Sequence, residues 1–221
     1  FALARENGPE KFRSWQDDFE HVYAYLQSLE PPKYPFAVDQ PLADTGKIAF
    51  EKTCARCHGK YDAGETYPSR IVDIDEVGTD RVRYDALPPL ARKIYGESWF
   101  NDYNRGVKSV DDPIGYVAPH LAGVWASPPY LHNGSVPTLW HLLHPDQRPI
   151  VWHRSSDDYD QQRVGLVVEE FSTLPPEVKR RDEKRTYFDT RKSGKSGAGH
   201  DYPDELTTEE KRAVLEYLKT L

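Results

Sequence analysis

The 221-residue chain has no methionine and only two cysteines, Cys54 and Cys57. A structural zinc site needs four nitrogen or sulfur ligands, and the chain has no second Cys pair and no His pair at zinc-finger spacing. His141 and His144, spaced by three, are a poor zinc alternative far downstream. The formal net charge of −7 argues against nucleic acid as a partner. No apolar run is long enough for a transmembrane helix, so we expect no membrane span.

Both cysteines lie in the segment Cys54-Ala55-Arg56-Cys57-His58. Cys-X-X-Cys-His is the attachment signature of c-type haem. The two thiols add to the vinyl groups of the haem, and the histidine supplies a nitrogen ligand to iron. A thioredoxin-like redox pair would need a βαβ context, which the flanking residues do not show. The sequence therefore predicts one covalent haem c, with its iron bound by His58.

The 18 prolines, 14 glycines and mean hydropathy of −0.77 indicate long loops between few helices. With the helices predicted below, we expect a mainly α fold with long irregular loops. Apolar spacing predicts an amphipathic helix over 11–29, which either packs as an appendage or ends a preceding domain. Residues 30–43 are interpreted as a linker and 44–221 as the haem domain. Further helices are expected at 44–53, 86–95, 139–143 and 207–221, and 145–205 is expected to be mostly loop, with a solvated charge run at 177–185.

Two segments resemble known haem proteins. Gly46 and Phe50, spaced i and i+4 before the Cys-X-X-Cys-His motif, are similar to the cytochrome c superfamily, in which a small residue lets the C-terminal helix cross closely. Residues 124–139, with Arg148-Pro149 and the loop 194–200, resemble bacterial di-haem cytochrome c peroxidases and, more closely, di-haem rubber oxygenases. The likeness covers roughly residues 20–221. It implies the cytochrome c-like C-terminal haem domain of such a protein.

The absence of methionine excludes His/Met ligation of the iron. We predict His200 as the second axial ligand, because it lies in a glycine-rich loop that permits close approach and because the resemblance implies the histidine of that loop. His132 is the second candidate, as a residue that supports a propionate or a ligand, and His144 is the third. The resemblance adds the remaining cofactor-binding candidates Trp125, Tyr130 and Arg148. His120 could hydrogen-bond the haem, and we interpret the other histidines as structural or surface residues: His21, His141 and His153.

Two histidine ligands would leave iron no open position, so outer-sphere electron transfer at comparatively low potential is the expected role. The partner would be a second haem domain or a redox protein. Two alternatives stay open: a peroxidase or oxygenase half-site with an exchangeable distal ligand, and a small-ligand haem sensor. Because haem c is attached outside the cytoplasm, we expect a periplasmic or otherwise exported protein whose leader has been removed.

Overall fold

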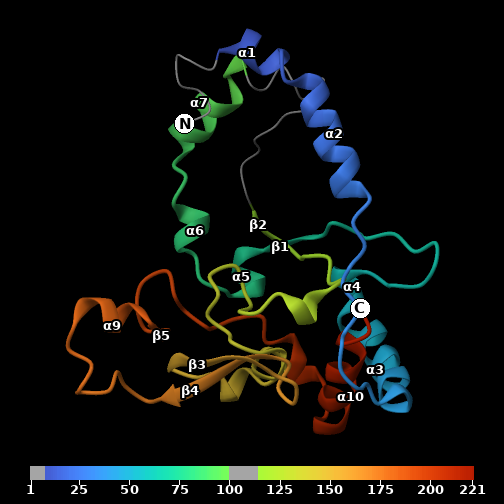
Figure 1. Cartoon of the computed structure of the whole chain (residues 1–221), viewed down its shortest axis with the longest axis vertical. Coiled ribbons are helices and arrows are strands. Elements are labelled where there is room, and N and C mark those ends of the chain that lie inside the picture. Colours follow the sequence, from blue (N-terminus) through green and yellow to red (C-terminus); the bar gives the residue numbers. More distant parts are fainter. Residues whose placement is uncertain (1–7, 100–113) are drawn as a thin grey trace. The chain divides into compact units, whose positions relative to one another are not determined.

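The computed structural model describes residues 8–99 and 114–221. The chain forms two compact units, of which the first combines residues 1–31 with 86–113 and the second combines 32–85 with 114–221 (Figure 1). Residues 1–29 were predicted as one segment around the amphipathic helix, and the part of it at 1–7 lies outside the described residues. No helix of the described part is long and apolar enough to cross a membrane.

The first unit contains α1 (Pro9–Arg13), α2 (Gln16–Gln27) and α7 (Pro89–Gly96). The single helix predicted over 11–29 is therefore divided in two at Ser14 and Trp15. The Ser14 hydroxyl donates to the Lys11 carbonyl oxygen, which satisfies an acceptor at the end of α1. Phe12 packs its ring against Trp15 and Trp99, with ring centroids 5.4 Å apart in both pairs. Aromatic packing thus connects α1 with Trp99, which follows α7 in the sequence.

The core of the second unit is the crossing of α3 (Gln40–Thr53) with α10 (Thr208–Leu218). A Cβ atom on Gly46 would lie only 1.9 Å from the Ala213 carbonyl oxygen, so the prediction that Gly46 permits a close crossing is confirmed. The α3 helix begins earlier than predicted, because Asp39 caps it by accepting from the Leu42 N–H. Residues 40–43 are accordingly helical rather than linker.

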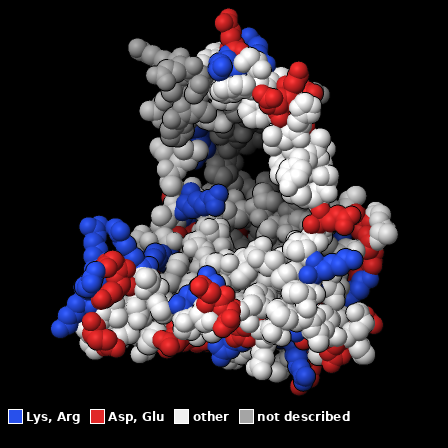
Figure 2. All heavy atoms as spheres, viewed as in Figure 1, with Lys and Arg blue, Asp and Glu red and all other residues white. Residues whose placement is uncertain are grey.

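The α10 helix begins with a capping box, in which the Thr207 hydroxyl accepts from the Glu210 N–H and the Glu210 carboxylate accepts from the Thr207 N–H. The short helix expected over 139–143 is present as α8 (Leu139–Leu143). The remaining short helical segments of the described second unit are α4 (Ala55–His58), α5 (Ile74–Val77), α6 (Val82–Asp85), η2 (Val124–Ala126), η3 (Pro145–Gln147), α9 (Arg181–Arg185) and η4 (Tyr202–Glu205). Residues 179–186, around α9, are exposed, and basic and acidic side chains are interspersed on the visible face (Figure 2). The charge run is a solvated surface, as predicted.

The prediction of a mainly α fold is wrong, because the described residues are 42% helical and 14% strand in two antiparallel sheets. In the first sheet β1 (Ile71–Asp73) pairs with β2 (Gly115–Val117). The second has the order β4-β3-β5, formed by β4 (Gly165–Phe171), β3 (Val151–Asp160) and β5 (Tyr187–Asp189).

The second sheet was predicted as loop because residues 153–160 are mostly polar and lack clear alternation. Its ladders are made by backbone hydrogen bonds, which polar side chains do not prevent. Two adjacent residues, Val151 and Trp152, are both buried, and the Trp152 ring stacks on Phe188 with centroids 5.1 Å apart. These contacts between distant segments, rather than local periodicity, stabilise the strands.

Candidate haem site

The Cys-X-X-Cys-His motif lies where α3 ends and α4 begins. Cys54 caps both helices, Cys57 is buried, and both thiols are free. Burial raises the pKa of the Cys54 thiol to about 12. A catalytic Cys-X-X-Cys pair instead lowers the pKa of its attacking thiol, so this environment does not suit thiol–disulfide exchange.

The His58 imidazole is held by a backbone carbonyl. Its Nδ1 lies 2.8 Å from the Pro119 carbonyl oxygen. Because a carbonyl can only accept, Nδ1 carries the proton, and Nε2 is left with a lone pair for a metal. Burial lowers the pKa of His58 and so favours the neutral imidazole that a metal requires. A backbone partner of this kind fixes the ring orientation of a metal-bound histidine.

Tyr61 supports the peptide groups on both sides of this contact. Its hydroxyl donates to the His58 carbonyl oxygen at 3.1 Å and accepts from the Leu121 N–H at 2.7 Å. Sequence reasoning missed both Tyr61 and Pro119. Tyr61 follows His58 by three residues and offered a local signal, whereas Pro119 lies 61 residues away and offered none.

His200 faces the same site. The ring centroids of His58 and His200 are 6.1 Å apart. Two imidazole nitrogens that bind one metal ion from opposite sides at about 2 Å place their ring centroids roughly 6 Å apart. The Nδ1 atom of His200 is buried without a hydrogen-bond partner. Burial lowers the pKa of His200 to about 4, with smaller contributions from His58 and Arg148. The separation of the two rings suits a metal ion held between them, and the assignment of His200 as a ligand stays a prediction.

The His200 backbone is fixed against the end of α5. Its N–H donates to the Val77 carbonyl oxygen at 2.7 Å, and its φ of +55° lies in the left-handed region. Gly199 also has a positive φ, +78°, and a Cβ atom there would lie 2.3 Å from the carbonyl carbon of Gly78. The glycines of this loop were expected to let the backbone approach a cofactor. Gly199 instead lets the backbone of the loop pack against the backbone at Gly78.

Arg148 holds the same loop from the other side. Its side chain, 6% exposed, donates to the carbonyl oxygens of Gly197, Gly199 and His200. Burial lowers the pKa of this guanidinium, although it remains a cation at neutral pH. Arg148 was predicted to bind haem. In the structure its hydrogen-bond partners include backbone carbonyls of residues 194–200, which we call the His200 loop.

The other predicted cofactor residues have partners within the protein. Tyr130 is buried in the core and donates its hydroxyl to the Val124 carbonyl oxygen at 3.1 Å. Trp125 donates its ring N–H to the Pro32 carbonyl oxygen at 3.1 Å. His132 stacks on Tyr116 with centroids 4.4 Å apart, and its buried Nε2 has no hydrogen-bond partner. Their assignment to the haem stays a prediction.

The remaining histidines of the second unit also contact protein groups. His144 Nδ1 lies 2.8 Å from the Trp140 carbonyl oxygen, and His120 packs its ring against Tyr61 at 4.9 Å and Tyr67 at 5.3 Å. In residues 8–99 and 114–221 there is no group of three or more His, Cys, Asp or Glu side chains arranged to hold a metal ion.

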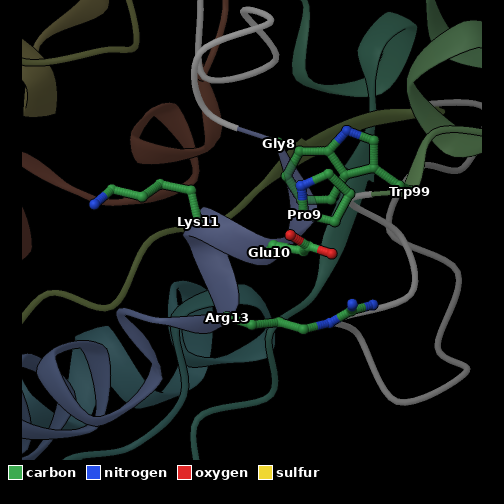
Figure 3. Close-up of a pocket in the computed structure, with 6 residues that line it drawn as sticks. All are labelled: Gly8, Pro9, Glu10, Lys11, Arg13 and Trp99. Carbon is green, nitrogen blue, oxygen red and sulfur yellow. The ribbon is translucent and has the colours of Figure 1, made fainter.

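An open hollow in the first unit contains none of the predicted site residues. It lies at the start of α1 (Figure 3) and is lined by Gly8, Pro9, Glu10, Lys11, Arg13 and Trp99.

Comparison with known proteins supports a cytochrome c-like region in the chain. Residues 115–153 match a family model described as RoxA-like, cytochrome c-like, and the matched span contains Pro119 and Arg148. Two uncharacterized proteins of Sinorhizobium fredii are similar to the chain. One, y4iM, is 32% identical over an alignment of 204 positions, gaps included, that spans 81% of this chain and 45% of y4iM. The other, y4iJ, is 26% identical over an alignment of 258 positions, gaps included, that spans 87% of this chain and 41% of y4iJ. The chain thus spans less than half the length of these relatives. It contains a cytochrome c-like region, and this implies haem c as its cofactor.

Proposed function

We propose that this chain is an electron-transfer domain with a single haem c, attached through Cys54 and Cys57 and ligated by His58 and His200. The observation that carries the proposal is the 6.1 Å separation of the two imidazole rings, which suits one iron between them. The bound haem would supply one-electron redox chemistry. The protein would hold both imidazoles in fixed positions and keep them neutral.

Electron transfer follows from the ligand set. With imidazole on both faces, peroxide or dioxygen could bind only after a protein ligand had left. The ligand set also lacks the methionine that raises the potential of other c-type cytochromes. A haem held by His58 and His200 would therefore supply one-electron transfer without an open site for substrate.

The electron partner is proposed from the lengths of the relatives. Because the chain matches less than half of each relative, a second haem domain on the same polypeptide is one candidate, and a separate redox protein is the other. Attachment of haem c outside the cytoplasm supports a periplasmic or otherwise exported location.

Replacing His200 tests the ligand assignment. We expect low-spin spectra for the wild-type protein in both redox states, with no carbon monoxide binding to the ferrous form. His200→Ala should become high spin and bind carbon monoxide. The matched control His132→Ala should keep the wild-type spin state and change only the potential. The assignment is wrong if His132→Ala opens the iron and His200→Ala does not.

Two further results would contradict the proposal. Release of the haem by acid–acetone from the wild-type protein would exclude thioether attachment. Rapid carbon monoxide binding to the wild-type ferrous protein would favour an exchangeable ligand instead. Turnover of peroxide would then distinguish a peroxidase-like site from a sensor.

A further inference from the structure

Arg148 joins two segments that are far apart in the sequence. Its Nη1 donates to the carbonyl oxygens of Gly197 at 2.7 Å and Gly199 at 2.6 Å, and its Nη2 donates to that of His200 at 3.3 Å. On the other side, Nε and Nη2 donate at 3.3 Å to the carbonyl oxygens at the end of α8, those of His141 and Leu142. The guanidinium therefore links the His200 loop to α8.

These partners are unusual for a buried cation. They are backbone carbonyls, and the nearby carboxylate of Asp201 lies 3.7 Å away with a side chain that is 62% exposed. The planar guanidinium can direct five N–H donors outward in fixed directions, whereas a lysine ammonium offers three donors from one point. Contact with carbonyls on two segments thus requires arginine rather than positive charge alone.

We propose that Arg148 is a positioning residue that fixes His200 in place as an iron ligand, an inference that rests on the function proposed above. The peptide groups around the His200 Cα atom are all fixed. The preceding carbonyl, of Gly199, and its own carbonyl are bound by Arg148, and its N–H is bound by the Val77 carbonyl oxygen.

This restraint matters because of the His200 conformation. A φ of +55° is unfavourable for a residue with a side chain and persists only where the surroundings impose it. Without the guanidinium, the carbonyls of the loop would turn toward water and the backbone would relax. The imidazole would then leave the iron for part of the time, and an external ligand could enter.

The test compares Arg148→Ala with the control Arg154→Ala. The Arg154 guanidinium also donates to backbone carbonyls, those of Ser156 and Asp157, but these lie in β3. We expect Arg148→Ala to raise the rate of carbon monoxide binding to the ferrous protein at least about tenfold, the effect of losing one charge-assisted hydrogen bond. A high-spin component should appear in its ferric spectrum, and added methylguanidinium should reduce both changes. Arg154→Ala should behave as wild type.

The outcomes separate this inference from the function on which it rests. If His200→Ala opens the iron but Arg148→Ala keeps the wild-type spectrum and carbon monoxide rate, the positioning role is wrong and the ligand assignment stands. If His200→Ala leaves the spectrum unchanged, both are wrong. If Arg148→Ala does not fold, Arg148→Lys tests the inference instead, because lysine keeps the positive charge but lacks the five N–H donors of the planar guanidinium. A wild-type spectrum and rate in Arg148→Lys would overturn the inference, and a partly high-spin spectrum would support it.

Discussion

Replacing Gly46 with alanine would test the helix crossing beside the haem motif. The added Cβ would lie 1.9 Å from the carbonyl oxygen of Ala213, 2.3 Å from its carbonyl carbon and 2.9 Å from the Val214 nitrogen. All three are backbone atoms of α10, so no side chain can rotate away. To reach ordinary contact in a closely packed interior, the two helices would have to separate by about 1.5 Å.

The cost of that separation exceeds the benefit of a better helix former. Overpacking of this kind costs about 1–3 kcal/mol, and the separation also loosens the packing of Phe50 on Tyr217, whose centroids are 5.2 Å apart. Alanine in place of glycine inside a helix stabilises the helix by about 1 kcal/mol. We expect a net loss of about 1–2 kcal/mol in the free energy of unfolding, which lowers the thermal midpoint by about 2–8 °C in a domain of this size.

Urea and thermal unfolding of the haem-loaded protein, followed by far-UV circular dichroism, would measure the loss. Ile48→Ala is the matched control, because Ile48 lies in the same helix and is 72% exposed. Its free energy of unfolding should stay within about 0.5 kcal/mol of wild type. A Gly46→Ala protein at least as stable as wild type would refute the close crossing.

Two other predictions concern the His200 loop and a buried histidine. Gly199→Ala should favour the high-spin form, because its Cβ would lie 2.3 Å from the Gly78 backbone at a φ of +78°, whereas Gly197→Ala, with its nearest neighbour at 3.7 Å, should keep the wild-type spectrum. Equal spectra for the two variants would contradict the backbone contact. Burial lowers the pKa of His141 to about 4; the Arg163 cation also lowers this pKa, whereas the carboxylates of Glu170 and Asp160 raise it. The unfolded chain therefore binds more protons than the folded one between about pH 6.5 and 4, and stability should fall as the pH falls through that window. Urea midpoints at pH 7 and pH 5 should differ less in His141→Gln than in wild type, and an unchanged difference would show that His141 does not cause the loss.

Features that depend on neighbouring residues could be predicted from the sequence. The Cys-X-X-Cys-His motif, the capping box of Thr207 and Glu210, and the short helix over 139–143 are each encoded within a few positions. Gly46 was predicted correctly through a resemblance, which supplied the partner helix that local reasoning could not. Two local features differ from the prediction: residues 9–27 form two helices, and α3 starts earlier. Both result from local capping and turn contacts, which the spacing of apolar residues does not reveal.

Features that depend on distant residues were not predictable in this way. The strands over 151–171 and 187–189 are stabilised by backbone ladders and by the packing of Trp152 on Phe188, so their polar sequence gave no clear period. His200 was chosen from its glycine-rich loop, but the loop sequence does not reveal that Gly199 packs on Gly78.

The sequence therefore indicates which residues could bind the haem iron, whereas the tertiary structure decides which groups hold those residues in place. The proposal of His58 and His200 as haem ligands came from a short motif and from composition, since a chain without methionine leaves histidine as the natural second ligand. Their geometry depends on chain segments that meet only after folding. The Pro119 carbonyl that orients His58 is 61 residues from it, and Arg148 is 52 residues from His200. A backbone carbonyl is present at every residue, so the sequence carries no mark of which one will become a partner, and folding alone selects it.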